Sequence, residues 1–193
     1  MELTEEEKGI LILAARDSIQ SLFGEKTTPV VDYNYFPELG QVGPGAFVTL
    51  TVNNKLRGCI GYINSNMTLF DTVCEAAKQA STNDPRFYPL SEEEFSRVNI
   101  EISILSLLTP ISSYQQIEIG KHGLVLDTKF NRALLLPQVA KENNYNIQQF
   151  LTALCEKAGI APYAWETDFL DIKTFTATVF SEEGKRKRTH EQN

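Results

Sequence analysis

The 193-residue chain has the length of one domain or slightly more. Its 42% hydrophobic and 22% charged residues are close to the averages of globular proteins, which excludes a disordered, collagen-like or coiled-coil chain. The net charge of −7 excludes a main surface that attracts nucleic acid through its phosphates, because like charges repel.

The first segment carries the signals of a helix. Thr4 and Glu7 form a T-x-x-E capping box ahead of an apolar run, which predicts a helix over residues 4–23. The stretch 25–44 is interrupted by prolines and glycines and predicts a loop. Within this loop, residues 30–33 could form a short strand.

A β-hairpin and a second helix follow. Gly45–Val52 and Lys55–Ile63 are rich in β-branched and apolar residues, and Asn53 and Asn54 between them tolerate the positive φ of a tight turn. Apolar residues then recur at helical spacing over residues 68–81.

The middle of the chain alternates between irregular and regular segments. Thr82–Leu90 contains two prolines, which excludes a regular element there. Ser91 and Glu94 form a second capping box and predict a short helix. Isoleucine and valine then alternate with polar residues over 98–104, the pattern of a half-buried strand.

The last part of the chain predicts two strands, a helix and one more strand. The strands fall at residues 122–127 and 132–136, the helix runs from its cap Asn146 to Gly159, and the final strand is Thr174–Phe180. Strands mainly joined by hairpins, with helices between and beside them, predict an α+β fold with a largely antiparallel sheet flanked by helices.

The least usual local sequence is LRGCIG, Leu56–Gly61. On a strand, Arg57, Cys59 and Gly61 would share one face, so the guanidinium could reach the sulfur and stabilise a reactive thiolate. Gly58 and Gly61 weaken a strand, and would permit a bulge or the close approach of a ligand or backbone. The alternative is a small buried cysteine, with both glycines fitting a crowded packing contact.

His122 is the only histidine outside the C-terminal tail, since the other is His190. Cys59 and His122 are therefore the only available Cys–His pair for nucleophilic catalysis, although 63 residues separate them in the sequence. The alternative is an exposed histidine in a hairpin turn. One histidine and scattered cysteines make a poor ligand set, so no metal site is predicted.

Three further polar residues are candidate substrate-binding groups. Pro85 keeps Asp84 out of the helical region, and Asp84 could orient Arg86 to bind an anionic substrate; the alternative is a structural Asp–Arg pair that holds the loop. Gln138 follows Pro137 at the end of an apolar strand and could bind a ligand or satisfy loop backbone. Trp165 is a candidate contact platform or a cover over the core.

The surroundings of the protein can also be predicted. Cys59, Cys74 and Cys155 form no C-x-x-C pair, the N-terminus lacks a signal-peptide pattern, and no apolar run has membrane-spanning length, so we expect a cytoplasmic protein that binds no membrane. No cofactor motif is present, and no cofactor is expected. Residues 182–193 carry the sequence KRKR and predict a basic flexible tail after a single domain at 1–181.

Seven of these segments, in this order, resemble the AmmeMemoRadiSam system protein A family, the AMMECR-type domain family. The matching segments are GAFVTL (Gly45–Leu50), LRGCIG, DPRF (Asp84–Phe87), EISILS (Glu101–Ser106), GKHGL (Gly120–Leu124), LLLPQVA (Leu134–Ala140) and LTALCEKAG (Leu151–Gly159). The resemblance implies two subdomains with a cleft between them, and LRGCIG near the cleft. It also implies a Memo-type protein and a radical SAM protein as partners, but no established reaction.

Two classes of function remain open at this point. In the first, the protein is an enzyme in which Cys59 is the nucleophile or redox group, Arg57 stabilises it, His122 transfers a proton, and Arg86, oriented by Asp84, holds the substrate. Its substrate would be a small molecule or a protein group. In the second, the protein is a non-enzymatic module whose cleft binds a peptide or the Memo-type partner. Nucleic-acid regulation through the tail is the weakest alternative.

Overall fold

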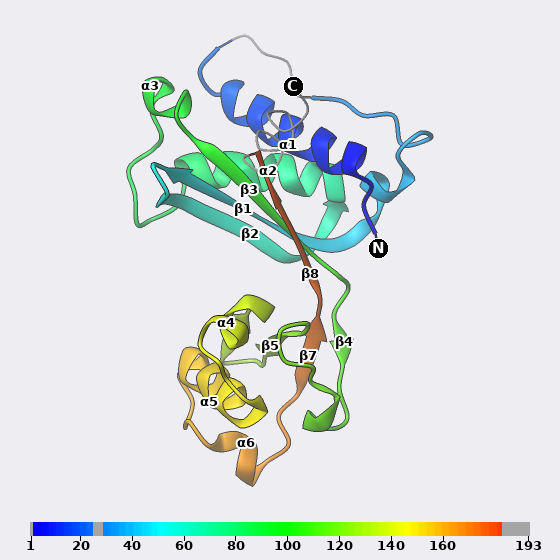
Figure 1. The fold of residues 1–193 in the computed structure, drawn as a ribbon, viewed down its shortest axis with the longest axis vertical. Coiled ribbons are helices and arrows are strands. Elements are labelled where there is room, and N and C mark those ends of the chain that lie inside the picture. Colours follow the sequence, from blue (N-terminus) through cyan, green and yellow to red (C-terminus); the bar gives the residue numbers. More distant parts are fainter. Residues whose placement is uncertain (1, 25–28, 183–193) are drawn as a thin grey trace, which may run out of the picture. The chain divides into compact units, whose positions relative to one another are not determined.

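The computed structural model describes residues 2–24 and 29–182, which divide into two compact units. Unit 1 comprises the chain up to Leu105 and the segment that begins at Thr178, and unit 2 is the continuous segment Ser106–Ala177 (Figure 1). Unit 2 is therefore inserted between two parts of unit 1. The basic tail predicted from residue 182 lies outside the described residues, apart from Glu182.

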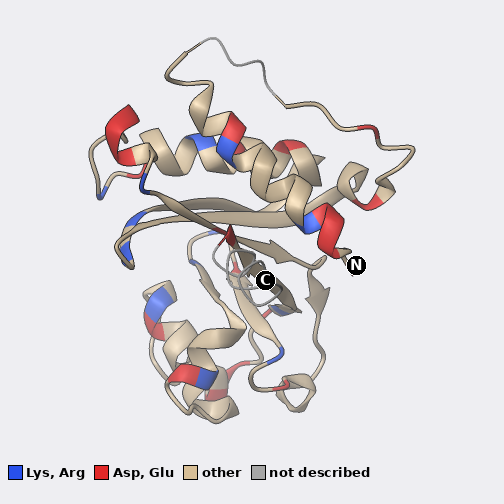
Figure 2. Cartoon of the chain, turned by 45° about the horizontal axis from the view of Figure 1, so that its top comes forward, with Lys and Arg blue, Asp and Glu red and all other residues tan. Residues whose placement is uncertain are grey.

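Unit 1 is a four-stranded sheet with helices on one face (Figures 1 and 2). The strand order is β2-β1-β3-β8, with β1 at Val42–Val52, β2 at Lys55–Thr68, β3 at Asn99–Leu105 and β8 at Ala177–Ser181. The helices are α1 (Glu5–Gln20), α2 (Leu69–Thr82), the short α3 (Glu92–Phe95) and the 3-10 turn η1 (Pro37–Gly40). Strand β2 lies at an edge of the sheet, so one side of its backbone has no neighbouring strand in the described structure.

The predicted starts of α1 and α3 and the predicted hairpin turn of unit 1 are confirmed, whereas α1 ends at Gln20 and not at residue 23. Thr4 and Ser91 each form a complete capping box at the start of α1 and α3. Asn53 and Asn54 adopt φ values of 51° and 59°, which lets β1 and β2 pair through a two-residue turn. Strand β2 continues to Thr68, beyond the predicted end at residue 63, because it stays paired with the start of β1.

The core of unit 1 lies between the helices and one face of the sheet. Ala46, Val48 and Leu50 of β1 and the isoleucines of β3 point to this side and are fully or almost fully buried. They pack against the apolar faces of α1 and α2. Among the described residues of unit 1, no helix covers the opposite face of the sheet (Figure 2), and the site candidate Cys59 lies on that face, as shown below.

Two predictions about strands are wrong. Residues 30–33 form no strand. The single strand predicted over Thr174–Phe180 is two strands, β7 (Ile172–Phe175) and β8, which belong to different sheets. The chain leaves one sheet for the other at Thr176, whose N–H donates to the Ser106 hydroxyl at 3.0 Å instead of to a strand. The residue pattern runs unbroken through this point because both strands are extended.

Unit 2 is a second four-stranded sheet packed against helices (Figure 1). The strand order is β4-β7-β5-β6, with β4 at Thr109–Pro110, β5 at Gly123–Asp127 and β6 at Arg132–Leu135. The helical elements are η2 (Tyr114–Gln116), α4 (Pro137–Glu142), α5 (Ile147–Ala158) and α6 (Ala164–Thr167). The predicted α5 is confirmed with its cap Asn146 and with Gly159 at φ 70°, and its buried face supplies much of the core.

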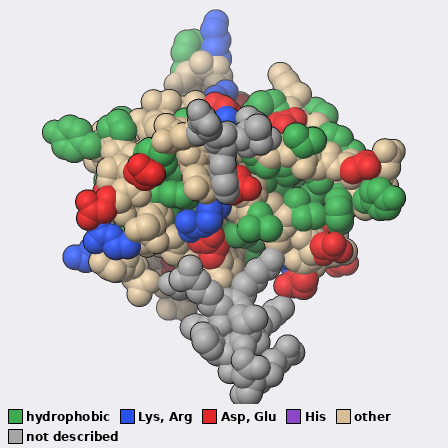
Figure 3. All heavy atoms as spheres, turned by 90° about the horizontal axis from the view of Figure 1, so that it is seen from above, with side chains coloured by type: hydrophobic (Ala, Val, Ile, Leu, Met, Phe, Trp, Pro, Cys, Tyr) green, Lys and Arg blue, Asp and Glu red, His purple; other side chains and the backbone are tan. Residues whose placement is uncertain are grey.

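The predicted α+β class is confirmed, because each unit combines helices with a four-stranded sheet, and the pairs β1–β2, β1–β3, β4–β7, β5–β6 and β5–β7 are antiparallel. None of the helices in the described part of the chain has the length and apolar character required to cross a bilayer. On the face seen in Figure 3, acidic side chains are interspersed with hydrophobic ones, and Lys and Arg occur singly or in small groups. This distribution agrees with the acidic composition.

Candidate functional site

Cys59 lies on β2 at the start of a row of polar side chains that crosses three strands. Thr49 of β1 is directly opposite Cys59, and Glu101 of β3 is directly opposite Thr49 on its other side. The three side chains therefore share the sheet face that the helices of unit 1 leave uncovered. The Thr49 hydroxyl donates a hydrogen bond to the Cys59 Sγ at 3.3 Å.

The DPRF loop holds the Cys59 backbone at the open edge of β2. The Cys59 N–H donates to Asp84 Oδ2 at 2.8 Å, and Arg86 Nη2 donates to the Cys59 carbonyl at 3.4 Å. An edge strand otherwise exposes these groups to solvent or to another chain. Asp84 thus supplies the acceptor and Arg86 the donor that a further strand would have provided.

Asp84 and Arg86 form a bidentate pair of unequal exposure. Arg86 Nε and Nη2 donate to the two carboxylate oxygens of Asp84 at 2.9 and 2.7 Å. The Asp84 side chain is 2% exposed and the Arg86 side chain is 54% exposed. The Arg86 hydrogen bonds, assisted by the backbone N–H groups of Cys59 and Arg86, hold the pKa of Asp84 well below its usual range despite burial.

Arg86 is the guanidinium hydrogen-bonded to Cys59, and it reaches the backbone carbonyl of that residue. The pKa of Arg86 is raised above its ordinary value, chiefly by its hydrogen bonds to Asp84. Arg86, and not the predicted Arg57, is therefore the cation bound to the Cys59 residue.

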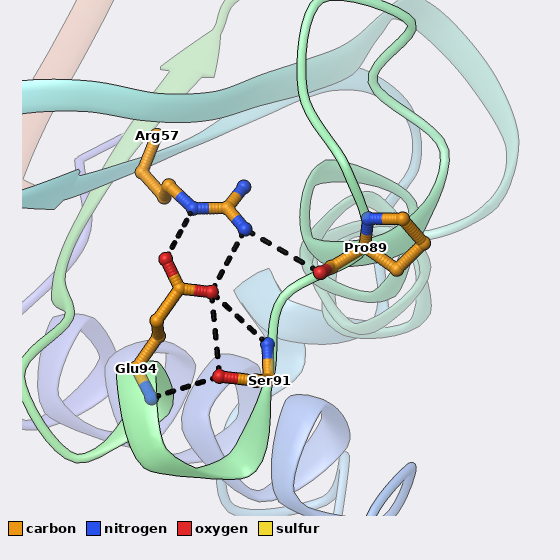
Figure 4. A network of polar contacts seen from close by, with 4 residues as sticks. All are labelled: Arg57, Pro89, Ser91 and Glu94. Atoms are coloured by element: carbon orange, nitrogen blue, oxygen red, sulfur yellow. Dashed lines mark hydrogen bonds and ion pairs between the residues drawn. The ribbon is translucent and has the colours of Figure 1, made fainter.

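Arg57 points to a different partner (Figure 4). Its Nε and Nη2 donate to the two carboxylate oxygens of Glu94, both at 3.0 Å, and Nη2 also reaches the Pro89 carbonyl at 3.4 Å. This pairing, together with the Ser91 backbone N–H, lowers the pKa of Glu94 to about 2. The hydrogen bonds of Arg57 thus tie α3 and its preceding loop to β2.

A β-bulge explains the direction of Arg57. The register shifts so that Gly58 faces Leu50 while Leu56 faces Thr51, which leaves Arg57 without a cross-strand partner. The alternation predicted for the LRGCIG segment therefore breaks at Arg57. Position in the sequence could not reveal this, because the bulge depends on how β1 and β2 pair.

Both glycines of the segment have packing roles. A Cβ on Gly58 would clash with the Ala80 carbonyl oxygen of α2, so glycine lets the helix approach the strand closely. A Cβ on Gly61 would clash with the Ala46 carbonyl oxygen and with Phe47, the residue opposite it on β1. Neither glycine needs a ligand to account for it.

Glu101 was not among the residues singled out from the sequence. It is partly buried on the same face as Cys59, and burial raises the pKa of its carboxyl group. The alternation of β3 places it opposite the isoleucine face, but only the register of β1 with both of its neighbours aligns it with Cys59. The alternation of β3 is therefore the signal in the sequence that could have identified Glu101, once the three strands were paired.

His122 and Gln138 belong to unit 2. The ring of His122 precedes β5, and its Nδ1 accepts a hydrogen bond from the Glu118 N–H at 3.2 Å. Gln138 lies in α4, and its Oε1 is buried without a hydrogen-bond partner among the described residues. The contacts of Cys59 described above all lie within unit 1. Between residues 2 and 182, outside the gap at 25–28, no three His, Cys, Asp or Glu side chains come together as metal ligands.

The likeness to known proteins covers almost the whole chain. The AMMECR1 family model matches residues 12–180. The chain belongs to the AMMECR1 family. Protein Mbar_A1807 of Methanosarcina barkeri is 35% identical over 99% of this chain and 98% of its own length, and protein MJ0810 of Methanocaldococcus jannaschii is 36% identical over 93% and 92%.

A solved structure supports the fold. The crystal structure of the uncharacterized protein PH0010 from Pyrococcus horikoshii is 32% identical, covers 95% of each chain and has a TM-score of 0.80. The predicted resemblance to the AMMECR family is thereby confirmed. The AMMECR1 family has no established biochemical activity.

Proposed function

We propose that Cys59, Thr49 and Glu101, on the face of the unit 1 sheet opposite to its helices, form a thiol-dependent site that acts on a small molecule or a protein group. The observation that carries the proposal is the hydrogen bond from the Thr49 hydroxyl to Sγ, at 3.3 Å. A hydroxyl that donates to sulfur stabilises negative charge on it, and the thiolate is the form that attacks electrophiles.

The other cysteines give a contrast within the same chain. Cys74 is 5% exposed and Cys155 is fully buried, and burial raises the pKa of both thiols. Cys59 is partly exposed and has a polar neighbour on the row. Of the three, it alone combines partial exposure with a hydroxyl that donates to its sulfur.

Glu101 supplies a proton-transfer group in this proposal. Its raised carboxyl pKa, caused by burial, brings it closer to neutral pH, where a carboxyl group can exchange protons with a bound substrate. Thr49 lies between it and Cys59. Asp84 and Arg86 act by fixing the backbone that carries the sulfur, and the exposed side of Arg86 remains available to an anionic group.

Alkylation kinetics test the role of Thr49. We expect Thr49→Val to slow the reaction of Cys59 with iodoacetamide at pH 7 about three- to tenfold, because a hydrogen bond to a charged group is worth about 1.5 kcal/mol or slightly less when the acceptor is sulfur. The rate is read at Cys59 by mass spectrometry of its peptide. The matched control is Thr51→Val, which lies one row further along the same face and should leave the rate unchanged. Equal rates in the Thr49→Val variant and the parent protein would refute the thiolate proposal.

A binding module is the second candidate function, and the DPRF loop favours it. Hydrogen bonds of Arg57, Asp84 and Arg86 hold this loop against the rest of unit 1. Tyr88, in the same loop, is 91% exposed. Exposed aromatic side chains on a fixed loop are typical contact residues of protein partners. The Memo-type or radical SAM protein implied by the resemblance is the partner this candidate would bind.

Two substitutions separate the candidates. If the loop binds the partner, Tyr88→Ala weakens binding to the purified Memo-type or radical SAM protein at least about tenfold, and Cys59→Ser leaves binding unchanged. If the site is catalytic, the Cys59→Ser variant loses the activity proposed for the thiol site, and the Tyr88→Ala variant retains it. Tyr88 suits this test because its exposed ring contributes little to folding.

A further inference from the structure

Unit 2 contains a groove on both sides of Trp165, remote in sequence from the LRGCIG segment and independent of the function proposed for Cys59. Two pockets of about 470 and 340 Å³ make up the groove, and both include Trp165 and Gln148 in their walls. Trp165 is the only tryptophan of the chain. The two pockets therefore form adjoining subsites that meet at one aromatic side chain.

The larger pocket has apolar and aromatic walls. Tyr114 stacks on Phe169 with ring centroids 4.9 Å apart and meets Trp165 edge-on at 6.3 Å. Ile147 and Leu151 of α5 complete the apolar lining. Phe169 remains 53% exposed, although it is large and apolar. A concave site with exposed aromatic walls suits an apolar side chain of a ligand.

The aromatic side chains are held in place by hydrogen bonds. The Tyr114 hydroxyl accepts from the Leu170 N–H at 2.9 Å and donates to the Asp168 carbonyl at 3.4 Å. The Trp165 Nε1–H donates to the Thr152 hydroxyl at 3.0 Å. Because these rings are already ordered, a ligand loses little affinity to the cost of fixing them.

The smaller pocket is acidic as well as aromatic. Glu156 and Glu166 are the only charged residues in its lining, and neither carboxylate forms an ion pair or hydrogen bond with another described residue. Tyr145, Tyr163 and Trp165 stand around them. Carboxylates and the faces of aromatic rings both attract cations, so this pocket suits the head group of a lysine or arginine side chain.

We propose that the Trp165 groove binds an extended peptide segment in which an apolar residue stands next to a lysine or arginine. The apolar side chain occupies the larger pocket and the basic side chain the smaller one. Gln148 borders both pockets, and its side-chain amide has no partner among the described residues. An amide at this position can donate to and accept from the backbone of a peptide that passes from one pocket to the other.

The single tryptophan gives a direct measurement. The probes are two peptides, acetyl-Gly-Leu-Lys-Gly-amide and the matched acetyl-Gly-Leu-Glu-Gly-amide, titrated into the full chain while the emission of Trp165 is followed. We expect a saturable change with the lysine peptide and at least about fivefold weaker binding of the glutamate peptide. The carboxylates and aromatic faces of the smaller pocket attract the lysine ammonium group and repel the glutamate carboxylate. No saturable change, or equal affinity for both peptides, overturns the proposal.

Matched variants test the two pockets separately. The double substitution Glu156→Gln with Glu166→Gln should weaken the lysine peptide about fivefold and leave the glutamate peptide no weaker, whereas Glu142→Gln, an exposed acid outside both pockets, should change neither. Phe169→Ala should weaken both peptides, and Phe130→Ala, 85% exposed elsewhere in unit 2, should weaken neither. Thermal unfolding confirms that each variant is folded. If Trp165 emission instead depends on protein concentration without peptide, the occupant is a second copy of the chain and the peptide proposal fails.

Discussion

The backbone of Cys59 is fixed by side chains that take the place of a neighbouring strand. Asp84 accepts from its N–H and Arg86 donates to its carbonyl, while Thr49 donates to its sulfur from the paired strand. Three residues thus determine where one thiol points. These hydrogen bonds satisfy backbone groups of the edge strand β2 whether or not the sulfur reacts. The stability of the fold therefore depends on Asp84.

Substitution of Asp84 tests that dependence. We expect Asp84→Asn to lower the free energy of unfolding by about 1–3 kcal/mol, because the amide cannot replace two charge-assisted hydrogen bonds to Arg86 in a buried position. Urea denaturation at pH 7 measures the change. The control is Asp127→Asn, since Asp127 forms a similar pair with Arg132 at the surface and should cost less than about 1 kcal/mol. Equal losses in both variants would show that the buried position of Asp84 confers no advantage.

At this scale the sequence predicted which residues matter better than it predicted their partners. Asp84 and Arg86 were expected to pair, and they do. Arg57 was expected to reach the sulfur because it is two residues away on a strand, and a bulge turns it toward Glu94 instead. Side-chain direction depends on strand register, which one segment alone does not contain.

Arg57 and Glu94 connect two elements, the edge strand β2 and the short helix α3. The helix has four residues, so its own hydrogen bonds hold it weakly. Its capping box and the bidentate contact with Arg57 supply the stability that so short a helix lacks (Figure 4). The position of the 85–90 loop, including Tyr88, therefore depends on this contact.

The stability that Glu94 contributes should depend on pH. Its pKa is about 2 in the folded protein and about 4.3 in an unfolded chain, so the contribution is complete above about pH 5 and is lost as the pH falls toward 2. We expect Glu94→Gln to lower the free energy of unfolding by about 1 kcal/mol at pH 7, because the pair is partly exposed. The difference from the parent protein should shrink between pH 5 and pH 3 in urea denaturation.

The neighbouring residue is the control for this prediction. Glu93 lies on the same helix and is exposed, so Glu93→Gln should have little effect at any of these pH values. A Glu94→Gln difference that stays constant down to pH 3 would contradict the assigned role of the carboxylate.

Local signals account for most of the elements that the sequence predicted. Capping boxes at Thr4, Ser91 and Asn146, and the positive φ of the asparagines between β1 and β2, fix helix starts and the hairpin through neighbouring residues alone. The division between β7 and β8 had no such signal. Thr174–Phe180 alternates without interruption, and the break arises from pairing with two different sheets.

The described part of the molecule has two hydrophobic cores, one in each unit. Leu69 belongs to the core of unit 1, and Leu154 belongs to the core of unit 2. Neither a linker composition nor a charge change marks the boundaries near residues 105 and 177, so the sequence predicted a single domain whose subdomain boundary stayed open. The boundary is visible only from the pairing of strands that are far apart in the chain.

Two reporters can show whether the cores unfold separately. Trp165 emission follows unit 2, and the protection of buried Cys74 from alkylation follows unit 1. Leu154→Ala should lower the urea midpoint seen by Trp165 more than the midpoint seen by Cys74, since the lost packing is worth about 2–4 kcal/mol within its own core. Leu69→Ala should do the reverse. Equal shifts of both midpoints in both variants would show that the two units unfold as one.

Strand β8 also sets the order in which the molecule can be completed during synthesis. The ribosome delivers this strand only after it has made all of unit 2, roughly 4–14 s after β3 at 5–20 residues per second. Until then β3 is the outer strand of the nascent sheet, with backbone groups open to pairing with other chains. Premature termination before β8 would therefore leave β3 as an unpaired edge strand, and such truncated products should be substrates for chaperones and proteases.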